Sequence, residues 1–172
     1  MMKKNNIIKN ISKKGFSLIE LMVVVVILSL MVLGLVTFFT GGARSWITGQ
    51  GQLQAQRNAR QAMDIMVREI READYVDDSS TSISIVFNTP FDGIISYSLP
   101  GGSSDLKRGG NTLISNVQSL TFLYFDASAN LVDPPDRDII SKVHIDLQVD
   151  VDQDSNPDIT LNTDVNLRNY GL

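Results

Sequence analysis

The sequence predicts an α+β fold in which one long N-terminal helix packs on an antiparallel β-sheet. Two observations lead to this prediction. An unbroken apolar segment near the N-terminus is followed by a stretch with helical periodicity, and the second half of the chain consists of short runs rich in β-branched and aromatic residues. The length of 172 residues suits one compact domain with an attached anchor.

The apolar segment is long enough to cross a membrane. Residues 21–36 are apolar except for Ser29 and Gly34, and with their flanks they form a 24-residue segment, 16–39. As a helix this segment is about 36 Å long, against a bilayer core of about 30 Å. Five lysines and no acidic residue precede it. The positive-inside rule therefore predicts a single-pass protein with its N-terminus in the cytoplasm and its C-terminal domain outside.

The remainder of the chain is acidic. Beyond residue 15, ten basic and nineteen acidic side chains remain, a formal charge of −9. This balance argues against a nucleic-acid partner, which requires Lys and Arg to neutralise phosphates. The chain has no cysteine, so disulfides and thiolate metal sites are excluded.

Three interpretations of the apolar segment compete. A secretory signal peptide cut after Ala43 would have an apolar core of about 7 to 15 residues, shorter than this one. A plain membrane anchor fits the length but does not explain Glu20, because a carboxylate within the hydrocarbon costs a few kcal/mol. It also gives no reason for Gly15. The third interpretation explains both residues.

The sequence KKGFSLIE, residues 13–20, resembles the signal of type IV pilins and of the pseudopilins of type II secretion. The resemblance implies that prepilin peptidase cleaves after Gly15 and methylates the new N-terminus, Phe16, with Lys13 and Lys14 supplying the positive charge of the leader. It also implies that Glu20 pairs with the N-terminal amine of a neighbouring subunit during assembly. Such a carboxylate is tolerated with its cation, and loss of one partner costs several kcal/mol.

Helical periodicity resumes after the apolar segment. Glycines at positions 41, 42, 49 and 51 each cost about 1 kcal/mol in a helix relative to alanine, which predicts a hinge. Beyond them, charged residues spaced four apart predict exposed ion pairs of Asp64 with Arg60 and Arg68, and of Arg68 with Glu72. Apolar residues at spacings of three and four predict a buried stripe: Ala59, Met63, Met66, Val67, Ile70 and Ala73.

Short alternating runs fill the rest of the chain, separated by segments that contain Gly, Pro, Asp or Asn. Such runs are typical of strands joined by turns. In residues 142–151 apolar residues alternate with polar ones, which predicts one core face and one solvent face. Strands are therefore expected at residues 83–87, 94–99, 113–114, 117–125, 142–151 and 159–167.

Candidate catalytic residues are scarce. The single histidine, His144, falls at a polar position of its strand, and no cysteine or second histidine completes a zinc or catalytic set. The glycines at 101, 102, 109 and 110 lack the spacing of a phosphate-binding loop. The sequence thus predicts a protein that is not an enzyme and has no organic cofactor.

One acidic segment has the pattern of a metal site. In DVDQDSNPD, residues 150–158, oxygen-bearing side chains alternate with the spacing of a calcium loop. Against this, Pro157 and Thr163 stand where an EF-hand has glycine and glutamate. The segment is either a solvated acidic turn or a calcium site formed by Asp150, Asp152, Asp154, Asn156 and Asp158.

Three further segments, 57–73, 113–126 and 165–169, resemble the minor pseudopilin J of type II secretion and minor pilins of the PilW type. This resemblance implies a pilin-like α+β fold divided into a leader (1–15), a transmembrane and filament-core helix (16–39), an amphipathic continuation (40–78) and a β domain (79–172). It implies a minor pilin or pseudopilin of the inner membrane, with a periplasmic or extracellular domain, whose partners are prepilin peptidase and other pilin subunits. The other function considered is a single-pass, membrane-tethered binding domain that does not polymerise.

Overall fold

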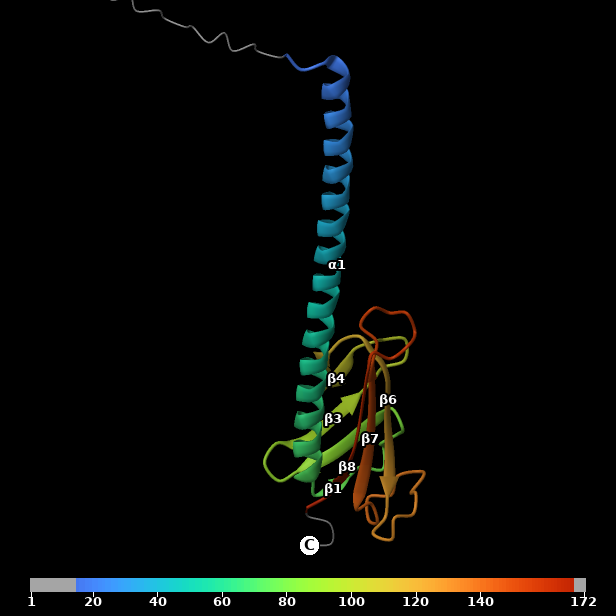
Figure 1. Cartoon of the computed structure of the whole chain (residues 1–172). Helices are drawn as coiled ribbons and strands as arrows, with labels where there is room; N and C mark the ends of the chain where they lie inside the picture. The colour runs from blue at the N-terminus through green and yellow to red at the C-terminus, as the bar shows by residue number, and fades with distance from the viewer. Residues whose placement is uncertain (1–14, 169–172) are drawn as a thin grey trace, which may run out of the picture. The chain divides into compact units, whose positions relative to one another are not determined.

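The computed structural model describes residues 15–168 and confirms the α+β class (Figure 1). One helix is followed by antiparallel strands. Contacts divide the chain into two compact units, which meet between Ile47 and Thr48 and are described separately below. The elements are α1 (Leu18–Arg71), β1 (Tyr75–Val76), β2 (Ser84–Thr89), β3 (Gly93–Ser98), β4 (Leu106–Arg108), β5 (Asn111–Ile114), β6 (Val117–Phe125), β7 (Lys142–Val149) and β8 (Ile159–Asn166).

Helix α1 is continuous, so the expected glycine hinge is not present as a break in the helix. All four glycines, at 41, 42, 49 and 51, have helical backbone. Their cost of about 1 kcal/mol each is a weak preference, and a cooperative helix with good helix formers on both sides overrides it. The helix ends at Arg71, before the boundary expected at residue 78, because Tyr75 and Val76 pair with Asn88 and Phe87 of β2.

The strands form two sheets where one was expected. The first has the order β1-β2-β3-β4-β5 and the second the order β6-β7-β8, with every pair antiparallel. Strands β1 and β4 were not predicted, because two or three residues are too few to show a period of two. The strand expected to reach residue 151 ends at Val149.

The core lies between the second half of α1 and the two sheets. Strand β7 alternates as predicted, with Val143, Ile145, Leu147 and Val149 buried. On α1 the buried stripe matches the predicted periodicity, although Val67 is only partly buried. The buried residues of the helix are Ala59, Ala62, Met63, Met66, Glu69 and Ile70.

Glu69 is the one charged residue on the buried face of α1 within the described part of the chain. Its carboxylate accepts a hydrogen bond from the Tyr97 hydroxyl (2.5 Å) and two from the Arg108 guanidinium (3.0 and 2.9 Å). This network joins α1 to β3 and β4. By contrast, the expected pairs of Asp64 and Arg68 are not among the ion pairs within 4.0 Å of residues 15–168.

Two buried tyrosines should make the protein unstable in alkali. Burial raises the pKa of the Tyr97 hydroxyl, helped by the Glu69 carboxylate, and burial also raises the pKa of Tyr124. Unfolded tyrosine loses its proton near pH 10. Above that pH the unfolded chain releases protons that the folded chain keeps, so stability is complete below pH 10 and falls as the pH rises.

The expected slope is up to about 1.4 kcal/mol per pH unit for each tyrosine that stays protonated. Denaturant unfolding of the full chain in detergent between pH 8 and 11 measures it. Tyr124→Phe should reduce the slope, and a slope equal to that of the parent would contradict the prediction.

Candidate functional site

The residues of the N-terminal signal lie at the start of α1. Gly15, Phe16 and Ser17 precede the helix, and the Leu21 amide donates to the Ser17 carbonyl at 3.2 Å. Ser17 is therefore the N-cap residue, a position that favours serine. Lys13 and Lys14 of the expected leader lie outside the described residues.

Glu20 lies in the first turn of α1, three residues after the N-cap. Serine followed three residues later by glutamate is the spacing of a capping box, and the positive end of the helix dipole favours a carboxylate there. The pattern S-x-x-E was overlooked in the sequence as a signal for the start of the helix. Glu20 is thus compatible with two roles, helix capping and pairing with another subunit.

Among residues 15–47, no other segment covers the apolar side chains of the first half of α1. Phe16 is 81% exposed, and the apolar side chains of residues 18–39 are all exposed. By length and composition, α1 is the only helix in the described residues that could cross a membrane, with a mean hydropathy of 3.0 in its most apolar window and none of that window buried. Such a surface requires lipid or other helices to cover it.

The polar side chains within this half are satisfied by the helix itself. The hydroxyls of Ser29, Thr37 and Thr40 donate to the carbonyls of Val25, Leu33 and Val36, four residues earlier. A hydroxyl bonded in this way can enter hydrocarbon without the penalty of an unpaired donor. Glu20 is the only ionisable side chain between Leu18 and Thr40, and the first cation of α1, Arg44, lies several turns further along the helix.

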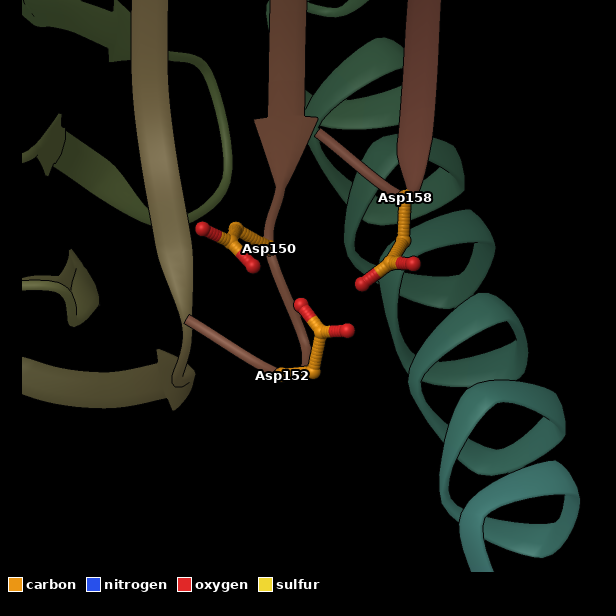
Figure 2. A group of neighbouring side chains, drawn as sticks. All are labelled: Asp150, Asp152 and Asp158. Atoms are coloured by element: carbon orange, nitrogen blue, oxygen red, sulfur yellow. The ribbon is translucent and has the colours of Figure 1, made fainter. Parts of the chain in front are cut away.

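The acidic segment forms the loop between β7 and β8 (Figure 2). It brings three of the five expected ligands together, since carboxylate oxygens of Asp150, Asp152 and Asp158 lie within 4.8 Å of one another. Asp154 is not part of this group. The Asp154 carboxylate instead accepts from the Asn156 amide at 2.8 Å.

Backbone amides donate to all three carboxylates, and the contact to Asp152, from the Asp154 amide, is the longest at 3.3 Å. Asp150, only 7% exposed, accepts from the amides of Gln153 (2.7 Å) and Ser155 (2.8 Å). Asp158 accepts from the Val151 amide (2.8 Å) and from the Gln52 side chain on α1 (3.3 Å). Gln153 and Ser155 have φ values of 60° and 73°, and this left-handed backbone turns the loop away from the spacing of an EF-hand.

Repulsion between the carboxylates is visible at Asp152. Its pKa is raised, first by desolvation and then by the charges of Asp154, Asp158 and Asp150. A divalent cation would relieve this repulsion, and carboxylate oxygens are the ligands that calcium prefers. The hydrogen bonds of the loop suit a solvated turn equally well.

His144 lies on the other face of the second sheet from the core. Its Nδ1 is 2.6 Å from Asp164 on β8, and Lys142 Nζ is 3.9 Å from the same carboxylate. No nucleophile is positioned by this group in the described part of the chain. The arrangement is a cross-strand polar cluster of a half-exposed sheet face.

Comparison with known families supports the N-terminal signal. Residues 11–36 match the family described as the prokaryotic N-terminal methylation motif. A search of curated proteins found no match to the chain. The matched residues include Gly15, Phe16, Glu20 and most of the apolar half of α1, and the motif indicates a membrane-anchored, type IV pilin-like protein that prepilin peptidase processes.

Proposed function

We propose that this protein is a minor pilin or pseudopilin, a subunit that enters a type IV pilus or a type II secretion pseudopilus or primes its tip. One observation carries the proposal. The methylation motif covers the start of α1, and every large apolar side chain of α1 from Leu18 to Val36 is exposed within the single chain. A helix of this kind is stable in a bilayer and, after extraction from it, in a bundle of similar helices.

In this proposal, prepilin peptidase cleaves after Gly15 and methylates Phe16, and Lys13 and Lys14 keep the leader in the cytoplasm. Residues 16–39 hold the subunit in the inner membrane and later pack in the filament core. Glu20 pairs with the amine of a neighbouring Phe16. The sheets lie on the periplasmic or extracellular side and contact other subunits.

The resemblance to pseudopilin J and to PilW-type minor pilins supports a minor subunit. It rests on the last turns of α1, on β5 and β6, and on the end of β8. The absence of cysteine agrees, because major pilins commonly close a C-terminal loop with a disulfide. A tethered domain that never polymerises is the competing function, and it requires neither cleavage after Gly15 nor a carboxylate at position 20.

The mass of the N-terminal peptide tests the proposal. Protein purified from its native membrane should begin at Phe16 and be heavier by one methyl group. Gly15→Leu should keep the leader attached, because a bulky residue blocks the peptidase at the cleavage site. Gly34→Leu is the matched control, since this helical glycine also has open space around it. A chain that begins at Met1 or Met2 would favour the tethered domain, and a start after Ala43 would indicate a secreted protein.

We also propose that Asp150, Asp152 and Asp158 bind calcium. The support is the convergence of their carboxylates within 4.8 Å. At a hundredfold excess over its Kd, calcium would stabilise the fold by about 2.7 kcal/mol. Thermal unfolding of the full chain in detergent, with calcium and with a chelator, measures this gain.

Paired variants separate a site from a solvated turn. Asp152→Asn should abolish the calcium-dependent rise in Tm, and without calcium it should leave Tm unchanged or higher because repulsion is relieved. Asp154→Asn is the control, since it removes the same charge from the same loop outside the group. An equal calcium response in the two variants, or none in the parent, would show that the loop is a solvated turn.

A further inference from the structure

A groove lies between α1 and β5, entirely within the unit that begins at Thr48. Its volume is about 400 Å³, inside the range of about 300 to 1,000 Å³ that is usual for ligand sites. Twelve residues line this α1–β5 groove, from α1, from β5 and the turn after it, and from the end of β7. None of the twelve is ionisable, although 20% of the whole chain is charged.

Small residues on α1 leave this space open. Gly51, Ala55 and Ala59 are spaced four apart, so they lie on one face of the helix. A Cβ atom added at Gly51 would meet nothing within 4 Å. Three of the lining residues, Ala59, Ile114 and Val149, are buried. The base of the groove is therefore apolar.

The sheet side of the groove is fixed by backbone hydrogen bonds. The Asp150 amide donates to the Asn116 carbonyl at 2.9 Å, and the Val117 amide donates to the Ser104 carbonyl at 2.8 Å. These bonds hold the turn between β5 and β6, which supplies Ser115 and Asn116 to the lining. The groove is thus formed by the fold itself, as small-molecule sites usually are.

Uncharged polar side chains complete the lining. Among residues 15–168 these side chains have no hydrogen-bond partner, and all but Asn116 are exposed along the rim: Gln54, Asn58, Thr112, Ser115 and Asn116. Each amide or hydroxyl can both donate and accept a hydrogen bond. A ligand that displaces water from them must offer donors and acceptors in return.

The lining determines the class of ligand. A phosphate or carboxylate would find no cation in the groove, and an amine would find no carboxylate. Hydroxyls and amides are the uncharged groups that match the rim, and the apolar base favours a methyl group or a C–H face. Sugar hydroxyls point outward around a ring, which suits polar groups on several sides of one hollow, whereas a peptide presents its amides along a line.

We propose that the α1–β5 groove binds an uncharged saccharide that carries acetamido groups. Gln54 and Asn58, one helical turn apart, bond to it from α1. Thr112, Ser115 and Asn116 bond to it from the sheet side, and an acetamido methyl group packs on the apolar base. The inference goes beyond the proposed pilin function and does not require that the protein enter a filament.

Calorimetric titration of the full chain, in a detergent without a sugar headgroup, tests the proposal. The probes are N,N′-diacetylchitobiose and cellobiose, which share their linkage and differ in having an acetamido group or a hydroxyl at position 2 of each ring. We expect diacetylchitobiose to bind about tenfold more tightly, since it adds a hydrogen bond and a buried methyl group. Its Kd should be the same at low and high salt, because no ion pair forms.

Two glycine variants test the position of the site. Gly51→Leu places a side chain in the groove and should lower the affinity at least about tenfold. It should not unfold the protein, because leucine favours a helix more than glycine does. Gly49→Leu is the matched control, since Gly49 is also helical with open space around it but does not line the groove, and it should bind as the parent does.

Two glutamine variants test the polar rim. Gln54→Ala removes one side chain that bonds to the saccharide and should weaken binding about threefold to tenfold. Gln56→Ala is the matched control, since Gln56 is exposed on the same helix but does not line the groove. It should leave the Kd unchanged.

Four results would overturn the proposal. They are no binding of diacetylchitobiose by the parent, unchanged affinity in both Gly51→Leu and Gln54→Ala, equal affinity for cellobiose or for the uncharged peptide N-acetyl-alanyl-alanine amide, and tighter binding of deacetylated chitobiose. The last result would indicate that the cationic amines bind at the acidic loop. None of them alters the expected N-terminal mass, so failure of the saccharide site is distinguishable from failure of the proposed pilin function.

Discussion

Replacing Glu69 with alanine is expected to lower the free energy of unfolding by about 2 to 4 kcal/mol. The change removes three hydrogen bonds to a carboxylate, and it leaves the fully buried Tyr97 hydroxyl without its acceptor. A buried unpaired polar group costs about 1 to 3 kcal/mol. Arg108 contributes less than a buried cation would, because its side chain is 39% exposed and can return to water.

Denaturant unfolding of the full chain in detergent measures this loss. Glu72→Ala is the matched control, since Glu72 is exposed one turn further along the chain and should cost less than about 0.5 kcal/mol. Glu69→Gln keeps the size of the side chain and an oxygen for Tyr97, so its cost should fall between the two. Equal stabilities of the Glu69→Ala and Glu72→Ala proteins would show that the network does not stabilise the fold.

The long elements of this fold could be predicted from the sequence, because each shows several periods of its pattern. The stripe on α1 and the alternation of β7 fixed their buried faces. Strands β1 and β4 could not be predicted in this way, because they exist only through pairing with β2, β3 and β5. The division into two sheets is likewise a matter of long-range pairing, which local pattern does not contain.

Glu69 shows a second limit of pattern reading. In the sequence, Glu69 falls on the apolar stripe of α1 beside Met66 and Ile70. A carboxylate at such a position indicates that a buried partner pairs with it. The identity of the partners was not predictable, since Tyr97 and Arg108 are 28 and 39 residues away in sequence. In the acidic loop, spacing suggested five ligands, but the folded loop, with left-handed backbone at Gln153 and Ser155, brings together only three of its four carboxylates.

Removing the charge of Glu20 is expected to leave cleavage after Gly15 intact and to lower incorporation into filaments by about a hundredfold to a few thousandfold. In the proposed assembly, Glu20 neutralises the amine of a neighbouring Phe16 away from water. An unpaired charge left in such an environment costs about 3 to 5 kcal/mol, and 1.4 kcal/mol corresponds to a factor of ten. Quantifying the subunit in sheared filaments relative to the membrane pool measures the effect.

Two variants separate this pairing from the local role of Glu20 at the helix start. Glu20→Gln keeps a capping box, because glutamine serves at that position as well as glutamate, but it carries no charge. Ser17→Ala removes the cap and keeps the charge, at a cost of about 1 kcal/mol to the helix. If Glu20 acts between subunits, Glu20→Gln should fail to incorporate as completely as Glu20→Ala, and Ser17→Ala should incorporate nearly as well as the parent. If Glu20→Gln incorporates normally instead, the carboxylate serves only to begin α1, and the register of the filament must be set elsewhere.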